Sequence, residues 1–254
     1  LLFGSGVTPV LEASNDLKLN GAKVFVDGNI VGYCTNPEQL AREFRDKRRR
    51  GETSTEVNIA YFSKSQVERE EIYINCDEGR VRRALIIVEN GVPKLNDEEI
   101  EKIRSKEWNW EDLIKRGIIE YIDAEEEENA LIALNQDEIV KDRTTHLEIT
   151  TYAILGTCAS LIPYAEHNQS PRNSYESAMS KQALGIYAVN FPLRVDSRSH
   201  ILHYPQTPVV QTKPLDVIGY NLRPAGQNCV VAVLSFEGYN MEDALIFNKA
   251  SIER

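Results

Sequence analysis

Two adjacent carboxylates near the end of the chain, Glu242 and Asp243, are the residues best suited to chemistry. They follow the apolar run Cys229–Leu234, which predicts a buried strand, and the turn Ser235–Gly238, which ends that strand. Carboxylate oxygens are hard ligands for Mg²⁺, which usually takes one or two of them together with phosphate oxygens. The pair therefore indicates either a magnesium site at a strand end or an acidic N-cap region before a helix at Ala244–Phe247.

A polar block, His167–Tyr175, is the second stretch with the composition of a site. It follows a segment rich in apolar and small residues, and polar groups beside a buried segment suggest a site rather than a core. Its one cation, Arg172, has a planar guanidinium that can bind two phosphate oxygens at once. The alternative for Arg172 is an ion pair at the protein surface.

Other charged groups point less directly to chemistry. The cations Lys47–Arg50 end a predicted helix, where they match the helix dipole, and such runs are usually solvated and only a weak indication of nucleic-acid contact. The acidic run Asp123–Asn129 favours a solvated turn or a helix start over a metal cluster. The histidines at positions 146, 200 and 203 have no spacing typical of metal ligands, and we expect structural roles for them.

The composition is that of an intracellular chain with hydrophobic cores. Its 254 residues are 42% hydrophobic, enough for one large domain or two to three small ones. No run approaches the roughly 18–20 apolar residues of a membrane span. The four cysteines lack the spacing of a zinc site or a disulfide framework, which indicates a reducing compartment. Because the chain begins without methionine, we expect it to be part of a longer polypeptide.

The charge is distributed unevenly along the chain. Residues 1–150 carry 21 basic and 31 acidic side chains, a net charge of -10, whereas residues 151–254 carry eight of each. A nucleic-acid module that works alone usually shows a basic face. We therefore expect weak binding of duplex DNA by this chain alone, with phosphate contacts made by a few placed residues and by partner chains.

The local patterns predict an α+β fold. Asp27-Gly28 between alternating apolar residues predicts a hairpin over 23–33, and Asn36-Pro37 predicts the start of a helix that closes at Gly51. Further strands are predicted at 57–61, 71–75, 82–88 and 118–122, and helices within 97–117, with a turn near Asn109, and at 174–184. The polar residues 135–145 predict a linker between two packing units.

Two long motifs resemble a known protein family. His167–Tyr175 continues into Ser180-Lys181-Gln182-Ala183, and Pro224–Asn228 is followed by Gly238–Ala244. Together they resemble the second-largest subunit of multisubunit DNA-directed RNA polymerases of the archaeal and eukaryotic type. The bacterial β subunit is similar only at Arg172, at Gln182 and in the G-Y-N-x-E-D block. The resemblance covers nearly the whole chain.

The resemblance implies a division into four regions. Residues 1–19 form a lead-in, 20–80 resemble the external 1 region, 81–140 resemble external 2, and 146–254 resemble the first part of the hybrid-binding domain. The implied fold is α+β, with small mixed external regions followed by a β-rich part of a larger domain.

The resemblance also implies a role in DNA-templated RNA synthesis. The partners would be the largest subunit, other polymerase subunits, the DNA template, the RNA transcript and nucleotide triphosphates. Asp243 and Glu242 would help to hold the second, substrate-associated Mg²⁺, which is shared with the largest subunit. The residues implied in nucleotide or RNA binding are Arg172, Tyr175, Lys181 and Gln182, and those implied in catalysis are Arg172, Glu242 and Asp243.

By the same resemblance, the isolated chain would be inactive, because the three-aspartate loop that holds the permanent catalytic Mg²⁺ belongs to the largest subunit. The implied location is the cytoplasm, or the nucleus for a eukaryotic source, without a membrane. The rival class is a non-catalytic structural or assembly module whose acidic first half binds partner subunits. A third class, a free-standing metal phosphotransferase, requires Glu242 and Asp243 to bind metal unaided.

Overall fold

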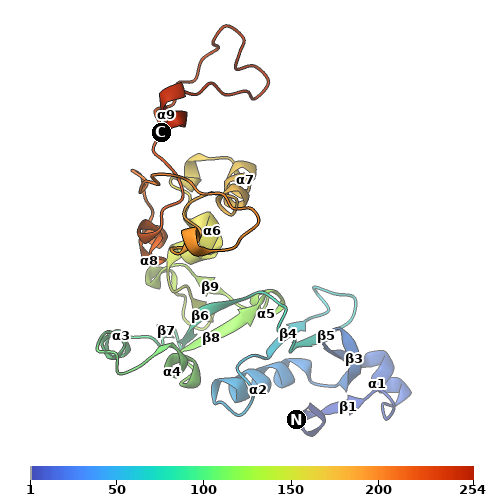
Figure 1. Cartoon of the computed structure of the whole chain (residues 1–254). Coiled ribbons are helices and arrows are strands. Elements are labelled where there is room, and N and C mark those ends of the chain that lie inside the picture. Colours follow the sequence, from blue (N-terminus) through green and yellow to red (C-terminus); the bar gives the residue numbers. More distant parts are fainter. Residues whose placement is uncertain (1) are drawn as a thin grey trace. The chain divides into compact units, whose positions relative to one another are not determined.

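The computed structural model describes residues 2–254, with side chains from residue 4 onward, and divides into two compact units, Leu1–Thr151 and Tyr152–Arg254 (Figure 1). Leu1, the first residue of the predicted lead-in 1–19, lies outside the described residues. The rest of that lead-in contains η1 (Leu2–Ser5), β1 (Val7–Pro9) and α1 (Asn15–Asn20).

The first unit begins with a five-stranded sheet in the order β1-β3-β2-β5-β4. Its other strands are β2 (Ala22–Val26), β3 (Asn29–Cys34), β4 (Asn58–Phe62) and β5 (Glu71–Asn75). The predicted hairpin is confirmed as β2–β3, where Val26 pairs with Asn29. The two turn residues, Asp27 and Gly28, have φ values of 46° and 80°, which is the positive φ that a two-residue hairpin turn requires.

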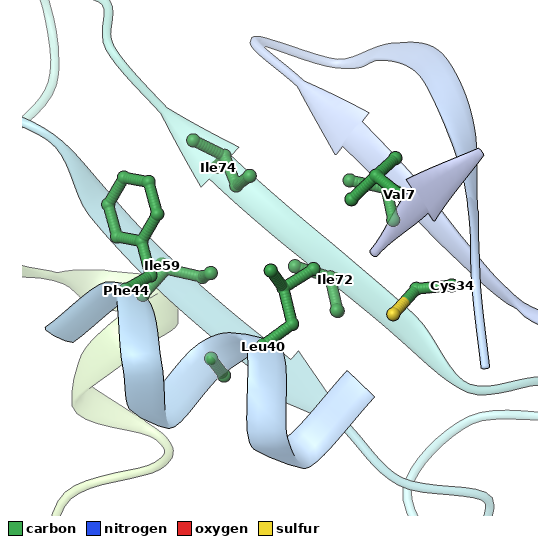
Figure 2. Packing of buried hydrophobic residues seen from close by; sticks show 9 residues of the cluster. Val7, Cys34, Leu40, Phe44, Ile59, Ile72 and Ile74 are labelled. Carbon is green, nitrogen blue, oxygen red and sulfur yellow. The ribbon is translucent and has the colours of Figure 1, made fainter. Parts of the chain in front are cut away.

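Helix α2 (Pro37–Arg49) packs against this first sheet through one apolar stripe. Leu40 and Phe44 are buried because residues four apart lie on the same face of a helix, and Ala41 is buried beside them. Figure 2 shows Leu40 and Phe44 directed at the strands that carry Ile59 and Ile72. The helix begins at Pro37 as predicted, since proline needs no N–H partner in the first turn.

A second sheet follows in the first unit, with the order β7-β6-β10-β9 and β8 paired to β6. Its strands are β6 (Arg82–Glu89), β7 (Val92–Pro93), β8 (Ile119–Asp123), β9 (Ile132–Ala133) and β10 (His146–Leu147). Two helices, α3 (Asp97–Arg104) and α4 (Trp110–Lys115), start at capping boxes formed by Asn96 and Asn109. The expected turn near Asn109 is therefore the start of α4.

The predicted linker 135–145 is an integral part of the first unit. It contains η2 (Gln136–Glu138), and the Thr145 carbonyl accepts a hydrogen bond from the Val88 amide at 3.0 Å. β10 then pairs antiparallel with β6 and parallel with β9. Because these polar residues have backbone partners in the second sheet, the boundary between the units lies after Thr151.

A buried ion pair network joins the two sheets of the first unit. Arg48 of α2 donates to both carboxylate oxygens of Glu126 at 2.7 Å, and to Glu120 at 2.7 Å. All three side chains are less than one-tenth exposed. The interpretation of Lys47–Arg50 as a solvated run is therefore wrong for Arg48, because its charge is neutralised by carboxylates that are distant in sequence.

Glu120 is the shared acceptor of this network. It also accepts hydrogen bonds from Arg49 at 2.6 Å and from His146 Nε2 at 2.7 Å. Burial alone raises the pKa of the Glu120 carboxyl, but the hydrogen bond from His146 and the charges of Arg48 and Arg49 outweigh burial and hold that pKa well below its ordinary value.

Glu126 belongs to the acidic run 123–129, which starts a helix rather than a solvated turn. The run forms α5 (Ala124–Glu127), whose N-cap Asp123 accepts from the Glu126 amide at 2.8 Å. Asn58 of β4 donates to Glu126 at 2.5 Å and to the Tyr121 carbonyl at 2.9 Å. The network thus links α2, β4, β8 and α5.

The second unit is built from short helices and turns. These are α6 (Gly156–Ser160), α7 (Ser170–Ser180), α8 (Lys213–Val217), α9 (Lys249–Glu253) and the 3-10 turns η3 (Thr151–Leu155, which begins at the boundary), η4 (Ala165–His167), η5 (Phe191–Leu193) and η6 (Tyr220–Leu222). The α+β class is confirmed for the chain. Within residues 2–254, every helix is too short or too polar to cross a lipid bilayer.

The expectation of a β-rich second part is wrong for this structure, since no strand is described after β10. The run Cys229–Leu234 forms no strand and is exposed, with Val230 at 104% and Val233 at 98%. A strand needs a neighbouring backbone to satisfy its N–H and C=O groups, and none of the described residues pairs with this run.

Replacing Glu120 with glutamine should remove a pH-dependent share of the stability of the first unit. The pKa of Glu120 is lower in the folded than in the unfolded chain, so its contribution is complete above the unfolded value of about 4.3 and declines as the pH falls below that value. Glu120→Gln should cost about 3–5 kcal/mol at pH 7, because Arg48 and Arg49 lose a charged partner.

Urea unfolding between pH 7 and pH 3, followed by tryptophan fluorescence, measures this effect, because both tryptophans, Trp108 and Trp110, lie in the first unit. Glu38→Gln is the control, since Glu38 forms an exposed pair with Arg42 and should contribute less than about 1 kcal/mol. An equal pH dependence in the wild type and in Glu120→Gln would contradict the role of this carboxylate.

Candidate functional site

Arg172 lies exposed in the first turn of α7, at the centre of the polar block His167–Tyr175. Its guanidinium carbon is 5.9 Å from the centroid of the Tyr175 ring, a cation–π contact. Among the described residues no carboxylate pairs with Arg172, so the alternative of a surface ion pair is not realised. The helix begins at Ser170 rather than at the predicted Ser174, because Pro171 fits a first helical turn.

Two asparagines hold the start of α7 against the preceding turn. The Asn173 side-chain amide donates to the Ala165 carbonyl at 2.8 Å, and Asn168 donates to the Asn173 side-chain oxygen at 3.2 Å. Tyr164, just before this turn, has a left-handed backbone with φ of 52°. The polar residues of the block therefore serve partly to position the helix that carries Arg172.

Lys181 and Gln182 lie at the opposite end of α7 and are both exposed. Lys181 is the C-cap, and the Gln182 amide donates to the Met179 carbonyl at 2.9 Å. Both lie after the last helical residue, Ser180, whereas Arg172 and Tyr175 are three apart within α7 and share one of its faces. Of the residues predicted to bind nucleotide or RNA, Arg172 and Tyr175 thus lie in the helix, and Lys181 and Gln182 follow its end.

The block Pro224–Asn228 packs beside the chain that leaves α7. A Cβ atom on Gly185 would lie 3.1 Å from the Pro224 carbonyl oxygen and 3.2 Å from the Ala225 Cβ, so a larger residue there would require this block to shift slightly. Asn228 accepts from the Val209 amide at 3.1 Å and donates to the Thr207 carbonyl at 2.9 Å. This block therefore has a structural role in the second unit.

Glu242 and Asp243 are the two central residues of a tight turn. Their φ values are 54° and 68°, and the Ala244 amide donates to the Met241 carbonyl at 3.1 Å. Positive φ at both central positions is the pattern of a type I′ turn, and it is uncommon for residues other than glycine, asparagine and aspartate. Both carboxylates are exposed.

The acidic N-cap alternative for these carboxylates is not realised. The predicted helix at Ala244–Phe247 does not form, and α9 begins later, at Lys249. Its N-cap is Asn248, which accepts from the Ser251 amide at 3.0 Å. Glu242 and Asp243 therefore stabilise no helix terminus in this structure.

Asn240 closes the loop that precedes the two carboxylates. Its side-chain oxygen accepts from the Phe236 amide at 2.9 Å, and its amide nitrogen donates to the Leu234 carbonyl. Asn240 was not among the residues predicted to have a functional role. The signal was present, because asparagine favours turns in which its side chain bonds nearby backbone.

Two exposed, adjacent carboxylates fit a weak and incomplete Mg²⁺ site. Magnesium in proteins commonly uses one or two carboxylates and completes its shell with water and phosphate oxygens. Within residues 2–254, no group of three or more His, Cys, Asp or Glu side chains could hold a metal ion. No described hydrogen bond or ion pair connects Arg172 with Glu242 or Asp243.

Comparison with known proteins identifies the family of this chain. Three family models match it, RNA polymerase Rpb2 domain 4 over 24–89, domain 5 over 110–175 and domain 6 over 158–254. The DNA-directed RNA polymerase subunit Rpo2 of Sulfolobus acidocaldarius is 53% identical over 247 residues, which cover 96% of this chain and 22% of that relative. This chain belongs to the family of second-largest RNA polymerase subunits.

Eukaryotic members of the family are also similar over most of the chain. The DNA-directed RNA polymerase III subunit RPC2 of Schizosaccharomyces pombe is 44% identical, covering 91% of this chain and 19% of the relative. The DNA-directed RNA polymerase II subunit 2 of Arabidopsis thaliana is 38% identical, covering 100% of the chain and 23% of the relative. The chain spans about a fifth of the length of these relatives. The match to Rpb2 domain 6 contains Arg172, Glu242 and Asp243.

Replacing Asn240 with alanine should loosen the loop before Glu242 without unfolding the second unit. The Phe236 amide would lose a hydrogen bond worth about 1 kcal/mol, so its hydrogen exchange should become roughly fivefold faster. Hydrogen-exchange mass spectrometry of the segment 229–247 measures this change. Asn248→Ala is the matched control, because it removes the cap of α9 and should affect only residues near 249–253. Unchanged exchange around Phe236 in Asn240→Ala would contradict the closing role of Asn240.

Proposed function

We propose that this chain contributes to DNA-templated RNA synthesis by helping a polymerase complex to bind the incoming nucleotide triphosphate, the second Mg²⁺ and the RNA near its 3′ end. The observation that carries the proposal is the exposure of Arg172, Glu242 and Asp243 within the region matched by Rpb2 domain 6. The complex would be the enzyme, a DNA-directed RNA polymerase, and the isolated chain is expected to be inactive.

Arg172 is proposed to bind the triphosphate. A guanidinium presents a rigid fork of donors to phosphate oxygens and keeps its charge at all working pH values. Placed at the leaving phosphates, it would stabilise the charge that develops on the departing pyrophosphate. The Tyr175 ring would line the same region and restrict the guanidinium to a few orientations.

Gln182 and Lys181 are proposed to contact the RNA near its 3′ end. The side-chain amide of Gln182, exposed just after the end of α7, can donate to a backbone oxygen. Lys181, the exposed C-cap of the same helix, would act as a positive charge toward the RNA backbone.

Asp243 and Glu242 are proposed to hold the second, substrate-associated Mg²⁺ together with the largest subunit. When bound, such an ion neutralises charge on the phosphate oxygens during in-line displacement. The two carboxylates are the central residues of one tight turn, and Asp243 is proposed as the direct ligand and Glu242 as a ligand through water.

An assembly role for part of the chain is favoured by a separate observation. The segment 229–247 exposes large apolar side chains, among them Val230, Val233, Leu245 and Phe247. Contiguous exposed apolar surface marks sites of contact with other polypeptides. We therefore propose that other polymerase subunits, with the largest subunit first among them, and the nucleic acids of the complex are the partners of this chain.

Substitution of Arg172 should slow nucleotide addition by the reconstituted polymerase. Arg172→Ala should reduce the rate by about 10²–10³, the usual effect of removing one charge-stabilising donor. Arg172→Lys should be intermediate, because it retains the charge and loses the fork. Single-nucleotide addition at limiting and saturating nucleotide is the measurement, and Arg104→Ala, at an exposed position on α3, is the control. Elongation by Arg172→Ala at the wild-type rate would exclude Arg172 from the reaction.

Removal of the Asp243 carboxylate should raise the Mg²⁺ concentration that nucleotide addition requires. Glu242→Ala should have the same effect more weakly, because residues that act through a bound water typically change metal affinity by about 10–100-fold. Melting temperatures should change little, since both side chains are exposed. A Mg²⁺ titration of single-nucleotide addition tests both variants beside Glu237→Ala, an exposed carboxylate of the same loop. If Asp243→Ala required the same Mg²⁺ concentration as Glu237→Ala, Asp243 would not be a ligand of this metal.

A further inference from the structure

A cleft of about 750 Å³ lies in the first unit, outside every residue named in the proposed function. It is formed by α2, by the turn after β6, by the chain after α5 and by residues 142–146. Four arginines line it, Arg42, Arg45, Arg49 and Arg143. The acidic residues in its lining are Glu89, Glu126 and Asp142. The size is that of a small-molecule site.

Most of these charges are already engaged with each other or with nearby groups. Arg42 pairs with Glu38 at 3.1 Å, and Arg49 pairs with Glu120 at 2.6 Å. The carboxylate of Glu126 is bound by Arg48, and Glu89 pairs with Lys94 at 2.6 Å. Arg45, Arg143 and one carboxylate, Asp142, make no ion pair with any of the residues from 4 to 254, so the unpaired groups of the lining have a net positive charge.

Arg45 is the central cation of the cleft and is half-buried. Its one side-chain hydrogen bond among the described residues goes from Nε to the Ala41 carbonyl at 3.2 Å, which leaves the outer edge of the guanidinium free. Burial lowers the pKa of Arg45 below its ordinary value; the charge of Glu126 opposes this, and those of Arg49 and Arg48 add to it. A guanidinium nevertheless stays charged, so an anion in the cleft would stabilise it.

Neutral donors complete the lining. The Thr144 hydroxyl oxygen accepts from the Val140 amide at 2.9 Å, so its own proton is available to a ligand. Asn90, in the turn after β6, has a left-handed backbone with φ of 54°, and it adds a side-chain amide. Two free guanidinium groups with a hydroxyl and an amide form a donor set suited to an oxyanion.

We infer that this cleft binds the phosphate group of a small molecule, with Arg45 and Arg143 as its charged ligands and Thr144 as a hydroxyl donor. Arginine forks match the geometry of phosphate oxygens, and burial of Arg45 strengthens the contact relative to an exposed pair. A small ligand is favoured over a nucleic-acid strand because residues 1–150 have a net charge of -10, which repels a long polyanion.

Titration calorimetry of the 254-residue chain with sodium pyrophosphate tests the inference, at constant ionic strength and with a chelator to exclude metal ions. We expect saturable binding to one site. Arg45→Gln and Arg143→Gln should each weaken binding about tenfold, the loss of one charged phosphate contact, and Arg45→Lys should be intermediate. Arg104→Gln, on the exposed face of α3, is the control for general charge and should have no effect.

A second control separates this cleft from the proposed nucleotide site. Pyrophosphate binding that disappears in Arg172→Ala and persists in Arg45→Gln and Arg143→Gln would assign it to the second unit and overturn the inference. Lack of saturable binding, or equal affinity in the wild type, Arg45→Gln and Arg143→Gln, would also overturn it. If a single-stranded oligonucleotide bound more tightly than pyrophosphate and depended on the same arginines, the ligand would be a nucleic-acid backbone and the inference of a small molecule would be wrong. Circular dichroism melting verifies that each variant is folded. If Arg45→Gln unfolds, Arg143→Gln tests the inference, because Arg143 is exposed.

Discussion

The burial of Arg48 between Glu120 and Glu126 is the interaction on which the first unit depends. Each sheet has its own apolar cluster, and this guanidinium joins α2 of one sheet to β8 and α5 of the other. A charge buried to this degree is tolerated only when its hydrogen bonds are nearly complete, and removing one partner leaves the other uncompensated. The relative position of the two sheets therefore depends on a few polar contacts.

The same network explains the free cations of the neighbouring cleft. Arg45, Arg48 and Arg49 lie within five residues on α2, but among the described residues only Glu120 of β8 and Glu126 of α5 form ion pairs with this group. Glu120 and Glu126 are fully engaged by Arg48, Arg49, His146 and Asn58. Arg45 is partly desolvated, and its only side-chain hydrogen bond among the described residues goes to the Ala41 carbonyl. A bound anion would therefore stabilise its charge.

The second unit is organised differently, and its exposed surface carries the residues of the proposed function. Few of its side chains are buried, namely Ser160, Ile162, Pro214 and Leu215. Helix α7 presents Arg172 and Tyr175 on one face, and the loop closed by Asn240 presents two carboxylates on a left-handed turn. A left-handed backbone is uncommon for residues other than glycine, asparagine and aspartate, so Glu242 is the less favourable residue of this turn.

Local patterns in the sequence determined those elements whose causes lie within a few residues. The Asp27-Gly28 hairpin, the helix begun by Pro37 and the caps at Asn96 and Asn109 follow from turn and capping chemistry that neighbouring residues complete. The long motifs around Arg172 and Glu242 were also sufficient to predict the polymerase family that the comparisons confirm.

Tertiary structure alone decided which charges are buried and which apolar run becomes a strand. Arg48 and Arg50 are alike in sequence, yet Arg48 meets Glu120 and Glu126 across 72 and 78 residues, whereas Arg50 stays exposed beside Glu52. Cys229–Leu234 has the composition of a buried strand but no pairing partner among the described residues. These ion pairs and strand pairings join groups from distant parts of the chain, and local sequence patterns do not predict such long-range contacts.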